Sequence, residues 1–188
     1  MFNIIEDFYL PNEIGLITLN FINLHFKPTY QPRVQNYGGD RFNAYPCYET
    51  EVFEKNDEEF SNYNIFKKKF EFHTNVKIKE LQTFLRKIKK DELKKSAAYK
   101  NNRPHKDDKN WDISGILYFN SGSIKDGTYI YNNESDFDPS IIIGSKLNRC
   151  VFYKSSIWHS PGMHQEIDER WVQPFFIKIE KNKEENET

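Results

Sequence analysis

The chain has 188 residues, of which 27 are basic and 28 are acidic, and its formal net charge is −1. This balance gives no electrostatic signal for nucleic acid, and no stretch approaches the roughly 20 apolar residues of a membrane span. Aromatic residues make up 16% and charged residues 29% of the chain. Together these features favour a β-rich fold with a hydrophilic surface and exclude a membrane-spanning helix.

The length and the cysteine content indicate the number of domains and the compartment. A chain of this length typically forms one domain; we expect it over residues 1–180, followed by a charged, disordered tail over residues 181–188. The two cysteines, Cys47 and Cys150, do not make a disulfide framework. The first ten residues contain two acidic side chains and no apolar core, so no signal peptide is expected. These features predict a cytoplasmic protein.

The N-terminal part combines a short strand, a helix and a long segment rich in turn formers. Residues 2–5 predict a strand, and Pro11 marks the start of a helix that ends before Lys27 and Pro28. Residues 28–64 contain several tyrosines, prolines and glycines. Two interpretations remain open for this segment. It is either a long loop that covers the edge of a sheet or a lid or wall of a substrate site.

The middle of the chain contains two further predicted elements. In residues 66–74, Phe70 and Phe72 alternate with charged side chains, which predicts a half-exposed strand. Residues 76–93 begin with apolar residues at a period of two and continue with helical spacing from Leu81 to Ile88. We therefore expect a strand followed by a helix in this second segment.

The C-terminal half is dominated by strand-like segments. They are aromatic and β-branched runs separated by turn residues, which is typical of a mainly β fold. Pro174 lies inside the last run and cannot donate a ladder hydrogen bond, so we expect an edge or a bulge there. The predicted strand regions cover residues 111–120, 126–131, 148–153 and 172–179.

Two histidines and an aspartate in this half form a candidate metal site. His105 and Asp107 are two residues apart, so in an extended strand their side chains point to the same face. His159 follows a later strand directly. Two histidines and one carboxylate, with the other positions open, are the ligand set of non-haem Fe(II) oxygenases. The alternative for His105 and Asp107 is a solvated loop, because short polar pairs also arise by chance.

The order of these motifs resembles the 2-oxoglutarate and Fe(II)-dependent dioxygenases, most closely the prolyl-hydroxylase-like branch. The resemblance covers roughly residues 100–180 and rests on His105-x-Asp107, Tyr118-Phe119-Asn120, the distal His159 and the trailing Arg170. It implies a double-stranded β-helix, which is a jelly-roll or cupin-like core, with helices packed on its outside. The strands that carry the motifs are expected to converge on one end of this barrel.

The same resemblance implies cofactors and roles for individual residues. His105, Asp107 and His159 are expected to hold Fe(II). Arg170 is expected to bind the far carboxylate of 2-oxoglutarate, because a planar guanidinium can donate two parallel hydrogen bonds to it, and Tyr118 is expected to hydrogen-bond the same group. With O2 as the other co-substrate, the implied reaction is hydroxylation of a peptide or protein side chain or of a small molecule.

Alternatives to two of the ligands remain open. His164, six residues before Arg170, competes with His159 as the distal histidine, although the Trp-His-Ser-Pro context directly after a strand favours His159. Asp108 competes with Asp107, but in a strand its side chain would point away from the other ligands.

Arg149 is either a second anion contact or an exposed strand arginine.

For the whole protein, one alternative function is a non-catalytic cupin-like module that binds a metal or another ligand. A module that only binds a metal needs no residues to hold a dicarboxylate such as 2-oxoglutarate. The presence of Arg170 and Tyr118 therefore favours the oxygenase. The other alternative is an interaction protein in which both histidines lie on the surface by accident.

Overall fold

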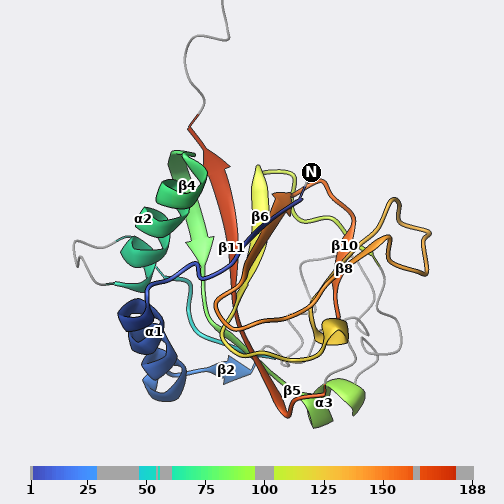
Figure 1. Ribbon diagram of the computed structural model, residues 1–188, viewed down its shortest axis with the longest axis horizontal. Coiled ribbons are helices and arrows are strands. Elements are labelled where there is room, and N and C mark those ends of the chain that lie inside the picture. Colours follow the sequence, from blue (N-terminus) through green and yellow to red (C-terminus); the bar gives the residue numbers. More distant parts are fainter. Residues whose placement is uncertain are drawn as a thin grey trace, which may run out of the picture.

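The computed structural model consists of two antiparallel β-sheets that pack face to face, with helices on the outside of the larger sheet (Figure 1). The structure describes residues 2–28, 47–53, 55, 61–95, 104–162 and 166–180. This arrangement is a mainly β, double-stranded β-helix with flanking helices, as the sequence predicts.

The larger sheet contains eight strands, which are β1 (Phe2–Ile5), β2 (Lys27–Pro28), β3 (Tyr48–Glu49), β4 (Ile78–Thr83), β5 (Arg86–Lys89), β6 (Ile113–Tyr118), β9 (Cys150–Lys154) and β11 (Glu169–Ile179). The long strand β11 lies at its centre. It pairs with β6 along one side and with β5 and then β4 along the other. β9 and β1 extend the sheet beyond β6, and β3 and β2 extend it beyond β5.

The smaller sheet contains three strands in the order β10 (His159–Pro161), β7 (Thr128–Ile130) and β8 (Ile141–Ile143). A single turn of 3-10 helix, η1 (Ile124–Asp126), precedes β7. On the side of β10 opposite to β7, His105 forms an isolated antiparallel bridge with His159. The segment around His105 therefore continues this sheet by one bridge.

The alternation of side chains along the strands divides the apolar interior into two cores. On β11, Val172 faces the smaller sheet, whereas Phe175 and Ile177 face the helices. The core between the two sheets is built from side chains of both, namely Tyr118, Ile130, Ile143, Val151, Tyr153 and Val172. This second core is the inside of the barrel.

Helices α1 (Pro11–Asn23) and α2 (Asn62–Thr74) lie against the outer face of the larger sheet, and a short helix α3 (Lys90–Lys95) follows β5 (Figure 1). α1 starts at a proline, and the Glu13 side chain accepts a hydrogen bond from the Leu10 backbone N–H at 2.8 Å. Both features satisfy or remove donors that a helix leaves unpaired at its start. The strand at residues 2–5 and the helix start at Pro11 are thus confirmed.

The strand expected over residues 66–74 is wrong, because these residues belong to α2. The Ser61 side chain caps this helix by accepting a hydrogen bond from a first-turn backbone N–H at 3.2 Å. Phe66 and Phe70, four residues apart, are fully buried against the larger sheet. Phe72, which suggested alternation, is 80% exposed. A residue spacing of four fits a helix as well as a strand, and the cap decides between them.

The helix expected from Leu81 to Ile88 is also wrong. Residues 78–83 and 86–89 form β4 and β5, which pair in succession with β11. Leu81, Leu85 and Ile88 are buried because strands cover them, not because they share one helix face. Helical structure begins only at Lys90.

Pro174 lies inside the larger sheet and not at an edge. It is opposite Ile116 of β6, and its carbonyl oxygen accepts a hydrogen bond from the Thr83 hydroxyl at 2.9 Å on the other side. In an antiparallel ladder the N–H and C=O of one residue point to the same side. The missing donor therefore faces the break between β4 and β5, which lies between Thr83 and Arg86. The irregularity that Pro174 predicts is therefore not an edge or bulge of β11 but the break between β4 and β5 beside it.

Most of the segment 28–64 and the tail 181–188 lie outside the described residues, so the loop, lid and tail interpretations stay predictions. Within the described ranges, no helix has the length and apolar character needed to cross a membrane.

Candidate metal centre

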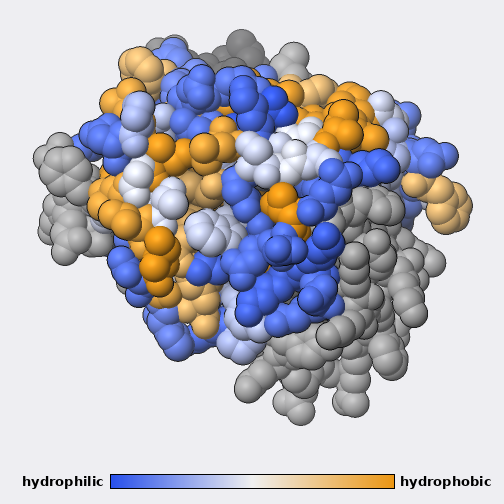
Figure 2. All heavy atoms as spheres, turned by 60° about the horizontal axis from the view of Figure 1, so that its bottom comes forward, coloured by the Kyte–Doolittle hydropathy of each residue, from blue (hydrophilic) through white to orange (hydrophobic). Residues whose placement is uncertain are grey.

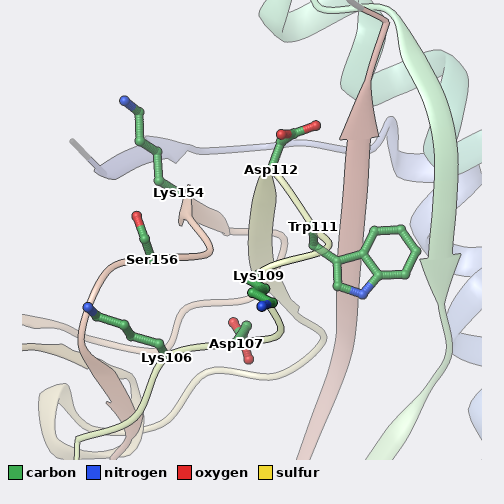
Figure 3. Close-up of a pocket in the computed structure, with 7 residues that line it drawn as sticks. All are labelled: Lys106, Asp107, Lys109, Trp111, Asp112, Lys154 and Ser156. Carbon is green, nitrogen blue, oxygen red and sulfur yellow. The ribbon is translucent and has the colours of Figure 1, made fainter.

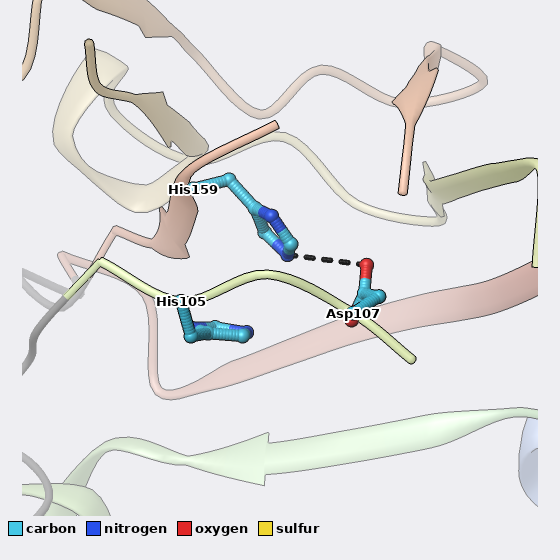
Figure 4. A group of neighbouring side chains, drawn as sticks. All are labelled: His105, Asp107 and His159. Atoms are coloured by element: carbon cyan, nitrogen blue, oxygen red, sulfur yellow. Dashed lines mark ion pairs between the residues drawn. The ribbon is translucent and has the colours of Figure 1, made fainter. Parts of the chain in front are cut away.

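Three polar side chains from two distant segments meet beside the smaller sheet (Figure 4). His105 and Asp107 come from the extended segment that precedes β6, and His159 is the first residue of β10. One imidazole nitrogen from each histidine and one oxygen of the aspartate lie within 4.8 Å of one another. The three residues that the sequence singled out as metal ligands therefore form one cluster.

Backbone hydrogen bonds place these three side chains. The His105 N–H donates to the His159 carbonyl and the His159 N–H donates to the His105 carbonyl, both at 2.9 Å. The Asp107 N–H donates to the Ser155 carbonyl at 3.1 Å. Directly paired residues of an antiparallel ladder project side chains to the same face. Asp107, two residues further along an extended chain, shares that face.

The orientation of the His159 ring leaves one nitrogen available for a ligand. Its Nδ1 lies 3.0 Å from the Ile157 carbonyl oxygen, so Nδ1 carries the proton and donates. Nε2 then has a free lone pair and lies 3.4 Å from Asp107 Oδ2. A hydrogen bond from the remote nitrogen to a carbonyl is the usual way in which proteins orient a metal-binding histidine.

The electrostatic surroundings favour the neutral form of His159. Burial lowers the pKa of the His159 imidazole below its ordinary value, and His105 lowers it further, whereas Asp107 raises it. The side chain of His159 is 8% exposed and that of Asp107 is 16% exposed, while His105 is exposed. A neutral imidazole is the form that binds a metal, so the cluster favours the ligating form of His159 and stays open on the His105 side.

The rival carboxylate points elsewhere. Asp108 Oδ1 accepts a hydrogen bond from the Asn110 N–H at 2.9 Å and so stabilises the turn that leads to β6. The rival histidine, His164, lies outside the described residues.

Arg170 is fully buried at the start of β11, in the inward-facing register of Val172. Its Nη1 donates to the Gly162 carbonyl at 3.3 Å and its Nη2 donates to the Gly127 carbonyl at 3.1 Å. Its Nε has no acceptor, and no carboxylate in the described part of the chain forms an ion pair with it. A buried guanidinium is costly without a counter-charge, so this position is suited to an anionic ligand.

The Tyr118 hydroxyl lies next to this guanidinium. It is 3.4 Å from Arg170 Nη2 and shares a hydrogen bond of 2.6 Å with the Thr128 hydroxyl. Burial raises the pKa of Tyr118, although Arg170 acts in the opposite direction. Tyr118 is therefore a neutral hydroxyl at neutral pH and is able to donate to an anion.

Tyr153 is a residue of this region that the sequence analysis missed. It projects from β9 into the barrel core, and its ring centroid lies 4.6 Å from that of His159. Burial raises the pKa of Tyr153 well above its ordinary value, and the charges of Asp107 and Tyr118 add to this effect. Tyr153 thus contacts the His159 ring and lies in the same core as Tyr118. Tyr153 could have been identified from the sequence, because it alternates with Val151 in a strand that leads directly to His159.

Thr128, which orients the Tyr118 hydroxyl, was also missed, because nothing local in the sequence marks it.

Arg149 already has an anionic partner. It forms an ion pair with Glu6 at 2.6 Å and donates to the Gly144 carbonyl, so it is not an open anion contact.

No protein-family model matches the sequence, and no curated protein matches it. Solved structures do resemble the chain. An oxidoreductase of the 2OG-Fe(II) oxygenase family from Burkholderia pseudomallei has a TM-score of 0.58 and 9% identity, over 94% of this chain and 84% of that chain. The chain has the fold of the 2-oxoglutarate-dependent Fe(II) oxygenases.

Two further structures extend this likeness to oxygenase folds with different bound molecules. A prolyl hydroxylase from Trichoplax adhaerens, in complex with a peptide fragment of hypoxia inducible factor, has a TM-score of 0.60 and 11% identity, over 94% of this chain and 82% of that chain. HygX from Streptomyces hygroscopicus, with nickel, 2-oxoglutarate and hygromycin B bound, has a TM-score of 0.57 and 8% identity, also over 94% and 82%. The oxygenase fold thus agrees with the barrel that the sequence predicts.

Proposed function

We propose that the protein is a 2-oxoglutarate- and Fe(II)-dependent dioxygenase of the prolyl-hydroxylase-like kind. In this reaction O2 and 2-oxoglutarate are consumed and one oxygen atom enters a substrate C–H bond to give an alcohol. The other oxygen atom enters succinate, and CO2 is released. The observation that carries the proposal is the coexistence, in one oxygenase barrel, of the His105–Asp107–His159 cluster and a buried Arg170 with no carboxylate partner among the described residues.

His105, Asp107 and His159 fit an iron ion, because two imidazoles and a carboxylate on one face leave the other coordination positions open. When bound, Fe(II) supplies the redox chemistry that couples decarboxylation of 2-oxoglutarate to oxygen insertion. The chain itself provides orientation. The Ile157 carbonyl accepts a hydrogen bond from His159 Nδ1, which leaves Nε2 available to hold the ion, and the Ser155 carbonyl accepts a hydrogen bond from the Asp107 N–H.

Arg170 and Tyr118 fit the far carboxylate of 2-oxoglutarate. The guanidinium has a donor at Nε with no acceptor among the described residues, and no carboxylate of these residues lies within ion-pair distance of it. Thr128 fixes the direction of the Tyr118 hydroxyl, which lies beside Nη2. Tyr153 contacts the His159 ring and would form a wall of the path between iron and Arg170, which keeps bulk water out. A hydrophobic barrel that excludes water protects reactive species.

The acceptor is a peptide or protein side chain or a small molecule. Both kinds of molecule occur in structures with this fold, as a bound peptide in the Trichoplax enzyme and as bound hygromycin B in HygX. We place the reaction in the cytoplasm, where the buried thiol of Cys150 and ferrous iron both stay reduced. A non-catalytic cupin-like module remains the second candidate, but it offers no role for Arg170.

The test is anaerobic addition of Fe(II) and then 2-oxoglutarate to the purified protein, followed by O2 and a succinate assay. We expect a weak visible charge-transfer band and slow succinate release, both lost in His159→Ala. His25→Ala is the matched control, because His25 is exposed and lies in the segment after α1. A folded protein with neither band nor succinate would refute the oxygenase and favour the binding module.

A further inference from the structure

A groove lies beside the metal cluster, between the segment 106–112 and the turn at residues 154–156 (Figure 3). It has a volume of about 410 Å³, which is in the range of sites for small ligands or single side chains. Asp107, a proposed iron ligand, is part of its wall. The groove therefore adjoins the proposed reaction centre. The other residues that matter for its chemistry are Lys106, Lys109, Trp111, Asp112 and Lys154.

The two walls of the groove are fixed to each other by backbone hydrogen bonds. The Asp107 N–H donates to the Ser155 carbonyl at 3.1 Å, and the Ser155 N–H donates to the Asp112 carbonyl at 3.2 Å. The Asp112 side chain in turn accepts a hydrogen bond from the Ile179 N–H of β11 at 2.9 Å. The groove is thus anchored to the central strand of the larger sheet and is present before any ligand binds.

The groove is positively charged. Lys106, Lys109 and Lys154 all line it, and none of them forms an ion pair with a carboxylate in the described part of the chain. The three lysines outnumber the two carboxylates in its wall, Asp107 and Asp112, so the groove has a net positive charge even without a metal. The whole chain has a net charge of −1, so this is a local feature and not a consequence of a basic protein.

Aromatic side chains frame the lysines. The Lys106 ammonium lies 4.4 Å from the centroid of the Trp158 ring, in a cation–π contact that directs it over the 154–158 turn. Trp111 forms the opposite side of the groove and packs near Phe176 of β11, with 6.2 Å between ring centroids. Figure 2 shows one face of the molecule, on which extended hydrophilic areas lie next to apolar ones.

We propose that this groove binds an anionic group of the substrate, a carboxylate or a phosphate, and thereby holds the atom to be hydroxylated near the metal. The proposal rests on the oxygenase function and names a substrate class for it. Three lysines that line a fixed groove attract an anion by their charge. An acidic peptide or an acidic small molecule would meet this requirement, and a cationic substrate would be repelled.

The test uses metal-free protein and a fluorescein-labelled hexaglutamate peptide, with binding followed by fluorescence anisotropy at low salt. The groove variant is Lys109→Gln/Lys154→Gln, which leaves Lys106 in place because it lies between two proposed ligands. The matched control is Lys125→Gln/Lys146→Gln, which removes the same charge. Lys125 is exposed on η1, and Lys146 precedes β9 at the end opposite to Lys154.

We expect the groove variant to bind hexaglutamate about fivefold more weakly than the wild type, because each exposed lysine–carboxylate pair contributes modestly. The control should bind like the wild type, and added salt should weaken binding. Equal loss in both variants, no binding by the wild type, or equal binding of labelled hexalysine would each overturn the proposal. Competition by unlabelled hexaglutamate or by inorganic phosphate then tells a carboxylate-bearing from a phosphate-bearing substrate.

The binding assay contains no iron, so it separates the two proposals. Hexaglutamate binding that depends on the groove lysines, in a protein that forms no succinate, would keep the anion site and refute the oxygenase. Succinate formation in a protein whose groove does not bind hexaglutamate would keep the oxygenase and refute the anion site.

Discussion

His105 and His159 each donate a backbone hydrogen bond to the other's carbonyl oxygen, at 2.9 Å. This doubly bonded bridge brings the two imidazole rings to 4.4 Å, centroid to centroid. The bridge is formed by backbone atoms alone, so replacing either side chain removes none of its hydrogen-bonding groups. Substitutions here therefore test metal binding more than folding.

The two neighbouring aspartates provide a matched pair of variants. Asp107→Asn should weaken Fe(II) binding by more than the roughly 10- to 100-fold that is typical for groups that only orient a ligand, because the negative charge next to the ion is lost. Asp108→Asn should leave it unchanged, since an amide oxygen can still accept the hydrogen bond from Asn110. Equilibrium dialysis with iron quantification measures both. Equal affinities would remove Asp107 from the ligand set.

Arg170→Lys should weaken 2-oxoglutarate binding by about tenfold or more, which is about 1.4 kcal/mol, and leave Fe(II) affinity nearly unchanged. A lysine ammonium cannot donate in the forked geometry that a carboxylate matches. Titration of the Fe(II)-loaded protein with 2-oxoglutarate, under anaerobic conditions, measures the effect. Because lysine also cannot reproduce the bonds to the carbonyls of Gly127 and Gly162, thermal unfolding of the variant is the necessary control. Unchanged 2-oxoglutarate affinity in a folded variant would exclude Arg170 from the site.

Two glycines should respond in opposite directions to the same substitution. A Cβ on Gly127 would lie 1.7 Å from the Ile143 carbonyl oxygen, and the Gly127 carbonyl accepts hydrogen bonds from both Arg170 and the Gly162 N–H. Gly127→Ala should therefore reduce the free energy of unfolding by roughly 3 kcal/mol or more and weaken 2-oxoglutarate binding.

Gly15→Ala is the counterpart. Gly15 lies inside α1, and a Cβ there would meet no atom within 4 Å. Alanine should increase the free energy of unfolding by roughly 0.5–1 kcal/mol, because glycine loses more backbone entropy in a helix. Urea unfolding of both variants measures the two effects, and a Gly127→Ala variant as stable as the wild type would contradict the packing described.

The pH dependence of stability should report the state of His159. Its pKa in the folded protein is lowered, chiefly by burial, so the unfolded chain binds more protons as pH falls through the ordinary histidine value of about 6.5. The stabilising contribution of neutral His159 is thus complete above that pH and is lost as pH falls towards the lower, folded pKa. Denaturant unfolding of metal-free wild type and His159→Gln at several pH values should give a smaller slope for the variant. Identical slopes would show that His159 does not titrate with a lowered pKa.

The candidate metal ligands could be identified before the fold because their geometry is partly local. His105 and Asp107 share a face in any extended segment, whatever surrounds it. The same is true of β6, β9 and β11, whose β-branched and aromatic runs have no competing helical period. Where the apolar spacing fits both periods, local reasoning failed. Phe66 and Phe70 lie in α2, and Leu81 and Ile88 lie in two strands.

The physical reason is that the central strand β11 decides the conformation of its neighbours. β4 and β5 are strands because β11 offers them unpaired backbone groups, and a backbone group that is buried without a partner is costly. The sequence of residues 78–89 alone does not show that β11 is available to pair with them. α2, in contrast, was open to prediction from the cap at Ser61, which the alternation around Phe72 obscured.

The sequence by itself determined the candidate ligand residues, the strand-rich C-terminal half and, through its motif order, the expected barrel. Only the tertiary structure decided which carboxylate and arginine are free to act. Asp108 is used in a turn and Arg149 is paired with Glu6, whereas the buried charge of Arg170 has no such partner among the described residues. Pairing of this kind joins residues far apart in the chain. It depends on how the two sheets fold onto each other and therefore leaves no local pattern in the sequence.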